Sequence, residues 1–331
     1  MTDWQLKTPI AFFIFNRPDT TARVYETIRR VRPRQLLVVA DGPRAGLLDE
    51  AEKCAAARAV IDRVDWECQV LTNYSDVNLG CKRRVSSGLD WVFNNVDEAI
   101  ILEDDCLPHP DFFRFCEMML EQYRHDTRIM MVCGTNYLLN VPTMPESYFF
   151  ASYYPVWGWA TWRRAWKLYD VEMHAWDGFK KQKQLQWIFG QKEVARYYEN
   201  MFELIYNGFD TWDIQWWFAC IFQNGLATIP RTNLISNLGI AGTHTQTQGA
   251  LYTDLPTYSL DIDHIRHPKY TTPDVVLNRL TFELSHADFN LSINAALKKR
   301  KVTSIIKVLF PYQVIQVLSK IKKLLKKMVF R

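Results

Sequence analysis

The chain has 331 residues, of which 48% are hydrophobic and 23% charged, a composition typical of a soluble globular protein with a sizeable core. No apolar run reaches the roughly 18 residues of a membrane span, and the first residues lack the basic and apolar regions of a signal peptide, so we expect a cytoplasmic protein. The seven cysteines include no CxxC pair and are odd in number, which argues against a disulfide framework.

The net charge of +4 is unevenly distributed. Eleven Lys or Arg residues and no Asp or Glu lie between Lys298 and Arg331. Without these eleven charges, the rest of the chain carries −7. The basicity therefore belongs to a tail, and we expect no nucleic-acid partner.

Strand-like and helix-like segments alternate over the first 124 residues. Strands are expected at residues 9–18, 34–43, 66–73 and 98–105, and helices at 19–31, 49–64, 82–96 and 110–124. Near-continuous apolar runs are typical of strands that are covered on both faces, and their alternation with helices indicates a βαβ series. The sequence therefore predicts an α/β fold, Rossmann-like, with a mostly parallel central sheet flanked by helices.

The second half of the chain is less regular. A strand is expected at residues 128–138, and a helical region at 177–207. An acidic turn and an apolar helix follow at 210–225, and then a strand leading into a loop rich in Gly, Thr and Asn at 226–245. Nine of the twelve tryptophans lie in this half, where they would form a bulky core or a stacking surface for sugar faces.

The tail has an amphipathic pattern. Beyond Pro311, apolar residues recur at helical spacing from Val314 to Met328, and lysines occupy the other positions. This pattern predicts a C-terminal amphipathic basic helix that binds a membrane surface. The alternative is a helix docked on the acidic body of the protein.

Polar side chains follow three of the expected strands. Asn16 and Arg17 follow the first, Asp41 the second, and Glu103, Asp104 and Asp105 the fourth. Ligands of parallel sheets bind beyond the carboxyl ends of the strands, so these residues are candidates for one site. Three adjacent carboxylates repel one another, and either solvent or a hard cation such as Mg²⁺ or Mn²⁺ would compensate them.

The segment "NLGCKRR" connects a strand to a helix. It contains Asn78 and Gly80, followed by Lys82, Arg83 and Arg84. A helix start beside arginines favours phosphate binding. A solvated basic helix face is the alternative for these three cations.

The ordered motifs "FNRP", "ADGP", "NLG", "EDDCLPHPDFF", "PVWGW" and "TWDIQWW" resemble those of GT-A fold glycosyltransferases. The chain is similar in detail to N-acetylglucosaminyltransferase I and related bacterial enzymes, from about residue 9 to 244. The resemblance implies a metal-dependent inverting glycosyltransferase that moves a sugar from a nucleotide-sugar donor, expected to be a UDP-sugar, to a glycan or lipid-linked acceptor. It also implies a catalytic domain at 1–290, with a nucleotide-binding half at 1–135 and an acceptor-binding half at 136–290. The tail, 291–331, would hold the protein on the inner face of the cell membrane.

The resemblance also implies roles for individual donor-site residues. Arg17 would contact the diphosphate, Asp41 the uridine, and Asp104 the sugar or ribose. Asp105 would bind Mn²⁺ or Mg²⁺, and Glu103 would support the site and the sugar hydroxyls. Arg84 stands at a basic donor-contacting position where the relative has His. The remaining candidates for donor binding are Asn16, Asn78 and Gly80.

Asp213 matches the position of the family's catalytic base. Inversion needs a base for the acceptor hydroxyl. We expect a carboxylate between Trp212 and Trp216 to be partly desolvated, which raises its pKa and suits a base. Asp210 is the rival base, and a helix N-cap is the structural alternative for Asp213.

The acceptor is expected to contact Trp157, Gly158, Trp159 and Trp212. His244, in the mobile-looking loop, would contact the diphosphate or the metal ion, or else be a surface histidine.

Two other functions fit the sequence. A sugar nucleotidyltransferase shares the expected fold, but such enzymes usually carry a Gly-rich phosphate loop after the first strand, which "FNRPDTT" does not contain. The other alternative is a non-catalytic sugar-binding protein associated with the membrane.

Overall fold

The computed structural model describes residues 4–47, 49–239 and 254–285. His244, the predicted tail helix and the predicted boundary at residue 290 lie outside these residues. The strands are β1 (Ile10–Ile14), β2 (Gln35–Ala40), β3 (Gln69–Tyr74), β4 (Glu98–Glu103), β5 (Cys106–Pro108), β6 (Ile129–Cys133), β7 (Tyr148–Ala151), β8 (Trp159–Trp162), β9 (Leu226–Pro230) and β10 (Ile235–Asn237). The helices are α1 (Pro18–Val31), α2 (Glu50–Ala59), α3 (Gly80–Asn95), α4 (Pro110–Gln122), α5 (Arg163–Trp166), α6 (Trp176–Lys181), α7 (Gln184–Phe189), α8 (Lys192–Tyr206), α9 (Asp213–Phe222) and α11 (Val275–Ser285).

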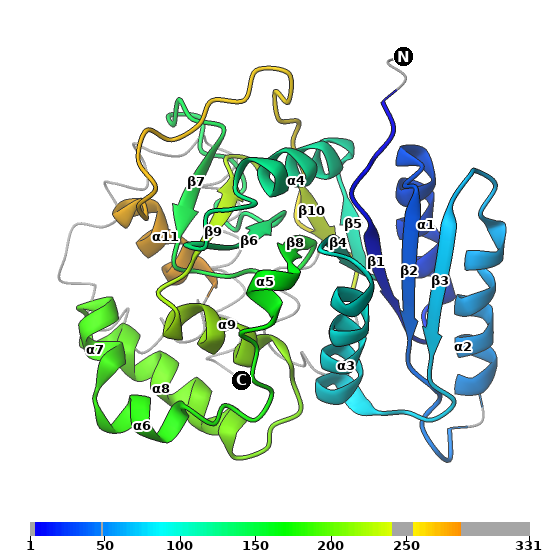
Figure 1. Ribbon diagram of the computed structural model, residues 1–331, viewed down its shortest axis with the longest axis horizontal. Helices are drawn as coiled ribbons and strands as arrows, with labels where there is room; N and C mark the ends of the chain where they lie inside the picture. Colours follow the sequence, from blue (N-terminus) through cyan, green and yellow to red (C-terminus); the bar gives the residue numbers. More distant parts are fainter. Residues whose placement is uncertain (1–3, 48, 240–253, 286–331) are drawn as a thin grey trace, which may run out of the picture. The chain divides into compact units, whose positions relative to one another are not determined.

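The central sheet is mostly parallel, as the sequence predicts. Its eight strands are hydrogen-bonded in the order β3-β2-β1-β4-β8-β6-β9-β7. β1 to β4 pair in parallel, whereas β7 and β9 are antiparallel. A separate two-stranded sheet joins β5 to β10. The predicted α/β class with flanking helices is therefore confirmed (Figure 1).

The chain folds into two compact units whose segments alternate along the sequence. The first unit comprises the described residues up to Asp104, with Leu120–Met131 and Ala160–Leu226. The second comprises Asp105–Met119, Val132–Trp159 and the described residues from Ala227 onward. The predicted functional halves, 1–135 and 136–290, stay a prediction.

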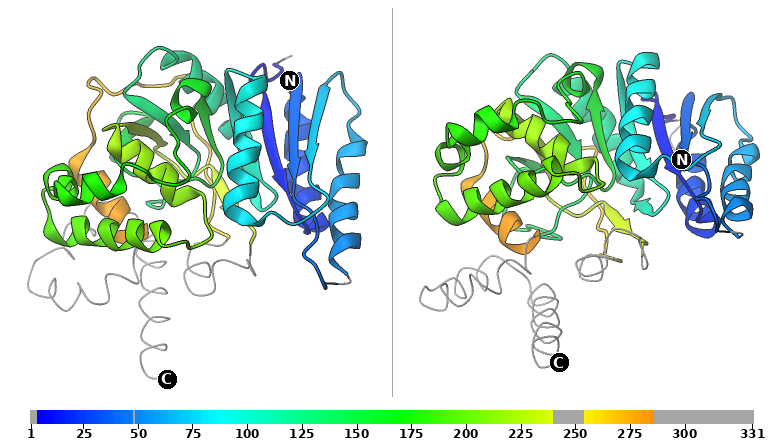
Figure 2. Two further views of the ribbon diagram at one scale, coloured as in Figure 1. Left: turned by 60° about the horizontal axis from the view of Figure 1, so that its bottom comes forward. Right: turned by 90° about the horizontal axis from the view of Figure 1, so that it is seen from below.

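In the first unit, helices cover both faces of β1 and β2, whose residues are almost all buried. Because βαβ crossovers are right-handed, the order β3-β2-β1-β4 places α1 and α2 on one face and α3 on the other, as the views of Figure 2 show. α3 packs closely, since a Cβ on Gly88 would come within 2.7 Å of the Phe13 and Val39 side chains. The buried residues Val24, Ile28 and Val31 of α1 have the predicted helical spacing.

The predicted helical region at 177–207 is divided into α6, α7 and α8. Lys183 and Gly190, on either side of α7, adopt left-handed backbone conformations that end a helix. Aromatic side chains join these helices to α9: the Trp176 ring lies 5.4 Å from Phe202 and 5.8 Å from Phe218, between ring centres. The tryptophan-rich half therefore supplies core, as one of the two interpretations of the sequence proposes.

The second unit has its own aromatic core. The Tyr148 ring packs edge-on against Phe115 and Phe150, at 6.1 and 5.8 Å between ring centres. Among the described residues, no helix combines the length and apolar character that crossing a bilayer requires.

Candidate functional site

The strand order reverses between β1 and β4. β2 and β3 extend to one side of β1, and β4 pairs with its other edge, with Phe13 opposite Glu103. At such a point the loops after two adjacent strands separate to opposite faces and leave a crevice, which is where ligands of parallel sheets bind. The residues that follow these two strands are Phe15 to Arg17 and Asp104, as the sequence analysis anticipates.

Asp104 is held by the residues that follow β1. The backbone N–H of Phe15 donates to its Oδ2 at 3.1 Å, and Nη2 of Arg17 lies 2.6 Å from its Oδ1. Asp104 is 2% exposed, whereas the Arg17 side chain is 35% exposed. The middle carboxylate of the acidic triplet is thus neutralised inside the protein, while Glu103 and Asp105 are only half-buried.

Asp41 fastens the loop after β2 to the loop before α3. Its Oδ1 accepts the N–H groups of Gly42 at 2.9 Å and Leu79 at 3.0 Å, and its Oδ2 accepts Nδ2 of Asn78 at 3.0 Å. Burial raises the pKa of this carboxyl, and the backbone N–H groups oppose that rise. Asp41 and Asn78 therefore shape the loop together, and their predicted donor contacts stay predictions.

Arg84 points from α3 towards β3. It is buried, and its Nη2 donates to the side-chain oxygen of Asn73 at 2.9 Å and to the Asn73 carbonyl. Burial lowers the pKa of its guanidinium. In this structure the side chain serves the α3–β3 contact, and its predicted donor contact is untested.

Asn16 belongs to a polar group around Glu50, at the start of α2. Nδ2 of Asn16 donates to Glu50 Oε1 at 2.8 Å, and the Arg44 backbone N–H donates to Oε2 at 2.6 Å. The Arg44 side chain also binds this carboxylate and, with burial opposing it, lowers the pKa of Glu50 to about 2. These contacts join the loops that follow β1 and β2.

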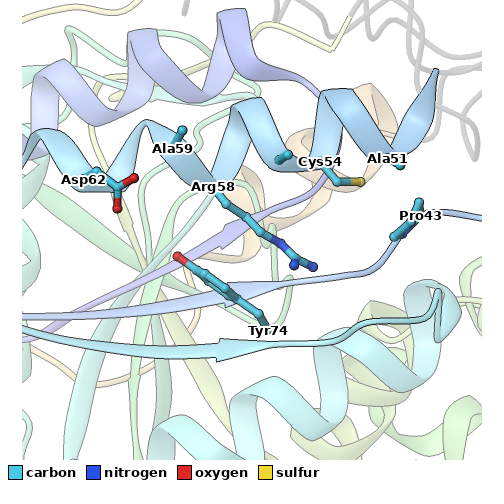
Figure 3. A pocket seen from close by; sticks show the side chains of 8 residues that line it. Pro43, Ala51, Cys54, Arg58, Ala59, Asp62 and Tyr74 are labelled. Carbon is cyan, nitrogen blue, oxygen red and sulfur yellow. The ribbon is translucent and has the colours of Figure 1, made fainter.

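A cavity of about 380 Å³ lies between α2 and β3 (Figure 3). The guanidinium of Arg58 lies over the Tyr74 ring, 4.9 Å from its centre. Nη2 of Arg58 also donates to the carbonyls of Asp41 at 3.0 Å and Ser75 at 2.6 Å. Arg58 therefore joins the ends of β2 and β3 behind the Asp41 loop.

Asp210 caps α3 from a distant part of the chain. Its Oδ1 accepts the N–H of Lys82 at 2.9 Å, and its Oδ2 accepts the N–H of Cys81 at 3.3 Å. Gly80 permits the approach, because its φ is +80° and a Cβ there would lie 3.1 Å from Asp210 Oδ2. The first N–H groups of a helix favour an anion, which Asp210 supplies here.

Asp213 begins α9 and is half-buried. The Thr211 hydroxyl donates to its Oδ1, and the hydroxyl of Tyr169 donates to the carbonyl of Trp212 at 3.1 Å. Burial, and then the negative charge of Asp213, raises the pKa of Tyr169. Trp212 itself is buried, so its side chain is core in this structure.

Cys81 connects this segment to the acidic triplet. Burial raises the pKa of its thiol, and the charges of Glu103, Asp213 and Asp210, in that order, raise it further. Carboxylates from the end of β4, the loop before α9 and the start of α9 therefore all act electrostatically on one side chain of α3. The predicted base and the end of the strand at the switch point thus influence the same thiol.

The second unit contains Asp105 and three of the four predicted acceptor residues, Trp157, Gly158 and Trp159. The carbonyl of Trp157 accepts the Thr135 hydroxyl at 2.8 Å, and the Trp157 ring stays half-buried. Gly158 has a φ of +60° and packs against Ile235. Trp159 is fully buried in β8 and offers no surface to an acceptor in this structure.

The side chains available for a metal ion are few. Among the described residues, no group of three or more His, Cys, Asp or Glu side chains is arranged to hold one. Asp105 is half-buried, its backbone carbonyl accepts the Leu238 N–H at 2.7 Å, and its carboxylate is a hard oxygen donor. One carboxylate fits Mg²⁺ or Mn²⁺ only where a substrate's phosphate oxygens supply further ligands.

Glu50, Arg58, Cys81 and Tyr169 are absent from the sequence-based candidates. In sequence they are ordinary helix or loop residues, and their importance depends on contacts with distant segments. The sequence motifs indicate where the strands end, but they do not identify the side chains that contact and position the loops after those strands.

Comparisons with known proteins identify distant structures only. No family model and no curated protein matches the chain. Among solved structures it is similar to the inositol-1-phosphate CTP transferase from T. maritima, with 8% identity and a TM-score of 0.35, over 72% of this chain and 90% of the other. It is also similar to UDP-glucose pyrophosphorylase complexed with UDP-glucose, with 9% identity and a TM-score of 0.22, over 44% and 62%. At these scores neither activity transfers to this chain, and the resemblance to N-acetylglucosaminyltransferase I stays a prediction.

Proposed function

We propose that the protein is a metal-dependent inverting glycosyltransferase that uses a nucleotide-diphosphate sugar, with a UDP-sugar as the first candidate. The acceptor would be a glycan or a lipid-linked sugar, reached at the inner face of the cell membrane. The observation that carries the proposal is the Arg17–Asp104 ion pair at the β1/β4 switch point. The negative charges of Glu103 and Asp213 both raise the pKa of Cys81, which supports a link between the strand end and the predicted base.

A donor diphosphate fits the Arg17 side of this arrangement. The Arg17 side chain is partly exposed, and a guanidinium recognises phosphate through two parallel hydrogen bonds. Asp104 fixes the guanidinium at the end of the strand, where a donor diphosphate would approach it. Asn16 and Asp41 hold the adjoining loops through Glu50 and Asn78.

Asp213 would accept the proton of the acceptor hydroxyl as that oxygen attacks the anomeric carbon. The Thr211 hydroxyl orients the Asp213 carboxylate. Asp210 is less suited to this role because both of its oxygens are engaged by N–H groups of α3. Asp105 would hold Mn²⁺ or Mg²⁺ together with the donor's phosphate oxygens, and a bound ion would neutralise the charge on the leaving diphosphate.

Nucleotidyl transfer is the competing reaction on a related fold. The names of the two proteins with similar solved structures, a CTP transferase and a pyrophosphorylase, indicate this reaction. Such enzymes usually carry a Gly-rich phosphate loop after the first strand, and that loop is absent from this sequence. In this protein α1 begins at Pro18, four residues after β1 ends, and no glycine lies between them. We therefore place glycosyl transfer first.

A nucleotide-sugar panel with Mn²⁺ tests the proposal. Release of nucleoside diphosphate indicates glycosyl transfer or donor hydrolysis. Release of inorganic diphosphate from a nucleoside triphosphate and a sugar 1-phosphate indicates nucleotidyl transfer instead. Binding without either product would identify a non-catalytic sugar-binding protein.

A thermal-shift measurement distinguishes a loss of metal-dependent nucleotide binding from a loss of protein stability. UDP with Mn²⁺ is expected to raise the melting temperature of the wild type, and Asp105→Ala should abolish that gain. Asp65→Ala removes an exposed carboxylate paired with Arg29 and is the matched control, for which the gain should persist. A wild type that responds to no nucleoside diphosphate would contradict the proposal.

A further inference from the structure

Helix α7 exposes a tryptophan. Trp187 is 83% exposed, the highest value among the large hydrophobic side chains that the structure describes, and the next residue, Ile188, is 39% exposed. All twelve tryptophans lie in the described residues, and Trp187 is the one with an exposed side chain. Contact with an apolar phase would remove this side chain from water, which is favourable in free energy.

A groove of about 520 Å³ on the same unit is lined in part by Ile188, the neighbour of Trp187 in sequence. Its walls include Phe179 of α6, Ile188 of α7, and Ile221 and Phe222 of α9. Phe222 is itself exposed. Figure 1 shows α6 and α7 grouped with α8 close to α9. The groove therefore continues the apolar surface that begins at Ile188.

The segment that carries Trp187 and Ile188 is rich in basic residues. Between Trp176 and Arg196 the chain has five basic and two acidic residues. Lys181, Lys183, Lys192 and Arg196 are exposed, and none of them makes an ion pair within the described part of the chain. Lys183 immediately precedes α7, so a cation borders the short helix that carries Trp187.

We infer that this surface, the Trp187 patch (Lys181, Lys183, Trp187, Ile188 and Phe222), inserts into an anionic phospholipid bilayer. Trp187 enters the boundary between headgroups and acyl chains, where an amphipathic ring is stable. The groove takes an acyl chain, and the lysines contact lipid phosphates. Lysine is depleted in protein–protein interfaces, which favours lipid over a protein partner. The inference is independent of the proposed transferase activity and of the tail.

Quenching by brominated lipids tests the inference on the full-length chain. Neither residues 286–331 nor residues 240–253 contain tryptophan, so attachment through the tail alone leaves the fluorescence unquenched. With phosphatidylglycerol vesicles carrying brominated acyl chains, wild-type emission should fall by the contribution of one tryptophan. Trp187→Phe should bind the vesicles equally well and lose this quenching.

Sedimentation with the same vesicles measures affinity. Trp187→Ser is expected to weaken binding on the order of tenfold, and Lys181→Gln or Lys183→Gln by about fivefold each. Tyr270→Ser removes another exposed aromatic side chain, 66% exposed in the second unit, and should leave the affinity unchanged. The inference is overturned if the wild type does not bind vesicles, if it binds without quenching, or if Trp187→Ser binds as the wild type does.

Discussion

Asp210 and Asp213 are separated by two residues, but the structure gives their carboxylates different tasks. Asp210 accepts two N–H groups at the start of α3, and Asp213 accepts the Thr211 hydroxyl at the start of α9. Asp210 therefore fixes the segment that carries Asp213. A residue three positions from the predicted base thus contributes to its placement.

Substitutions of these two aspartates should separate stability from turnover. Asp210→Ala removes a helix cap and should cost about 1 kcal/mol of unfolding free energy, whereas Asp210→Asn, which caps as well, should cost less. Asp213→Asn should lower turnover by at least about 100-fold, the contribution of a general base. Urea unfolding and nucleoside-diphosphate release measure the two effects. Equal losses of turnover in Asp210→Asn and Asp213→Asn would contradict the assignment of roles.

Glu50 predicts a pH dependence of stability. Folding lowers its pKa from 4.5 to about 2, chiefly through Arg44, so ionised Glu50 favours the folded state above about pH 4.5. That contribution is lost as the pH falls towards 2. The difference in unfolding free energy between the wild type and Glu50→Gln should therefore be constant above pH 4.5 and shrink below it. Glu52→Gln, an exposed change on the same helix, provides the control.

At the scale of elements, the contact of α3 with the sheet depends on Gly88. A Cβ at this position would meet the Phe13 and Val39 side chains at 2.7 Å, in the well-packed interior between α3 and the first two strands. Glycine within a helix lowers the stability of that helix. Its presence in the middle of α3 indicates that the close packing of α3 against the sheet stabilises the protein by more than the glycine costs.

Two glycine substitutions should therefore change stability in opposite directions. Gly88→Ala should destabilise by about 1–3 kcal/mol through overpacking. Gly178→Ala in α6, where no heavy atom lies within 4 Å of the added Cβ, should stabilise by up to about 1 kcal/mol through helix propensity. Chemical denaturation of both variants checks the pair. A stabilising Gly88→Ala would show that Phe13 and Val39 can move aside.

The sequence predicts the alternating elements up to residue 124 because each has a strong local pattern. It does not predict β8, a four-residue strand that pairs beside β4 although it lies more than 50 residues away. It also misses the breaks around α7, because nothing in the local hydrophobic pattern shows that Lys183 adopts a left-handed conformation. The spacing of apolar residues along the chain indicates whether a segment is a helix or a strand. The neighbour with which a strand pairs depends on contacts between residues that are distant in sequence.

At the scale of the molecule, local sequence patterns also fail to reveal how the residues of the candidate site contact one another. The sequence places Arg17, Asp41 and Asp104 at strand ends, because carboxyl ends of parallel strands share one edge. It does not pair Arg17 with Asp104 or place Asp210 on α3, because those contacts join segments about 90 and 130 residues apart. Positions were predictable from topology, and side-chain partners were not.

The division of charge in the whole chain predicts a salt dependence of membrane binding. The tail from Lys298 onward carries eleven basic residues, and the rest of the chain has a net charge of −7. Each lysine near an anionic surface contributes about 1 kcal/mol to binding at low salt. Binding to phosphatidylglycerol vesicles should fall at least about tenfold between roughly 0.05 and 0.5 M NaCl, as screening shortens to a few ångströms.

Sedimentation across this salt range also separates the two hypotheses for the tail. A tail that is free to bind lipid gives an affinity that decreases steadily with salt. A tail docked on the acidic body must first be released, and moderate salt weakens that contact too, so binding would rise before it falls. Vesicles of neutral phosphatidylcholine are the control, since they offer the cations no charge. We expect the steady decrease, and a maximum at intermediate salt would identify the docked tail instead.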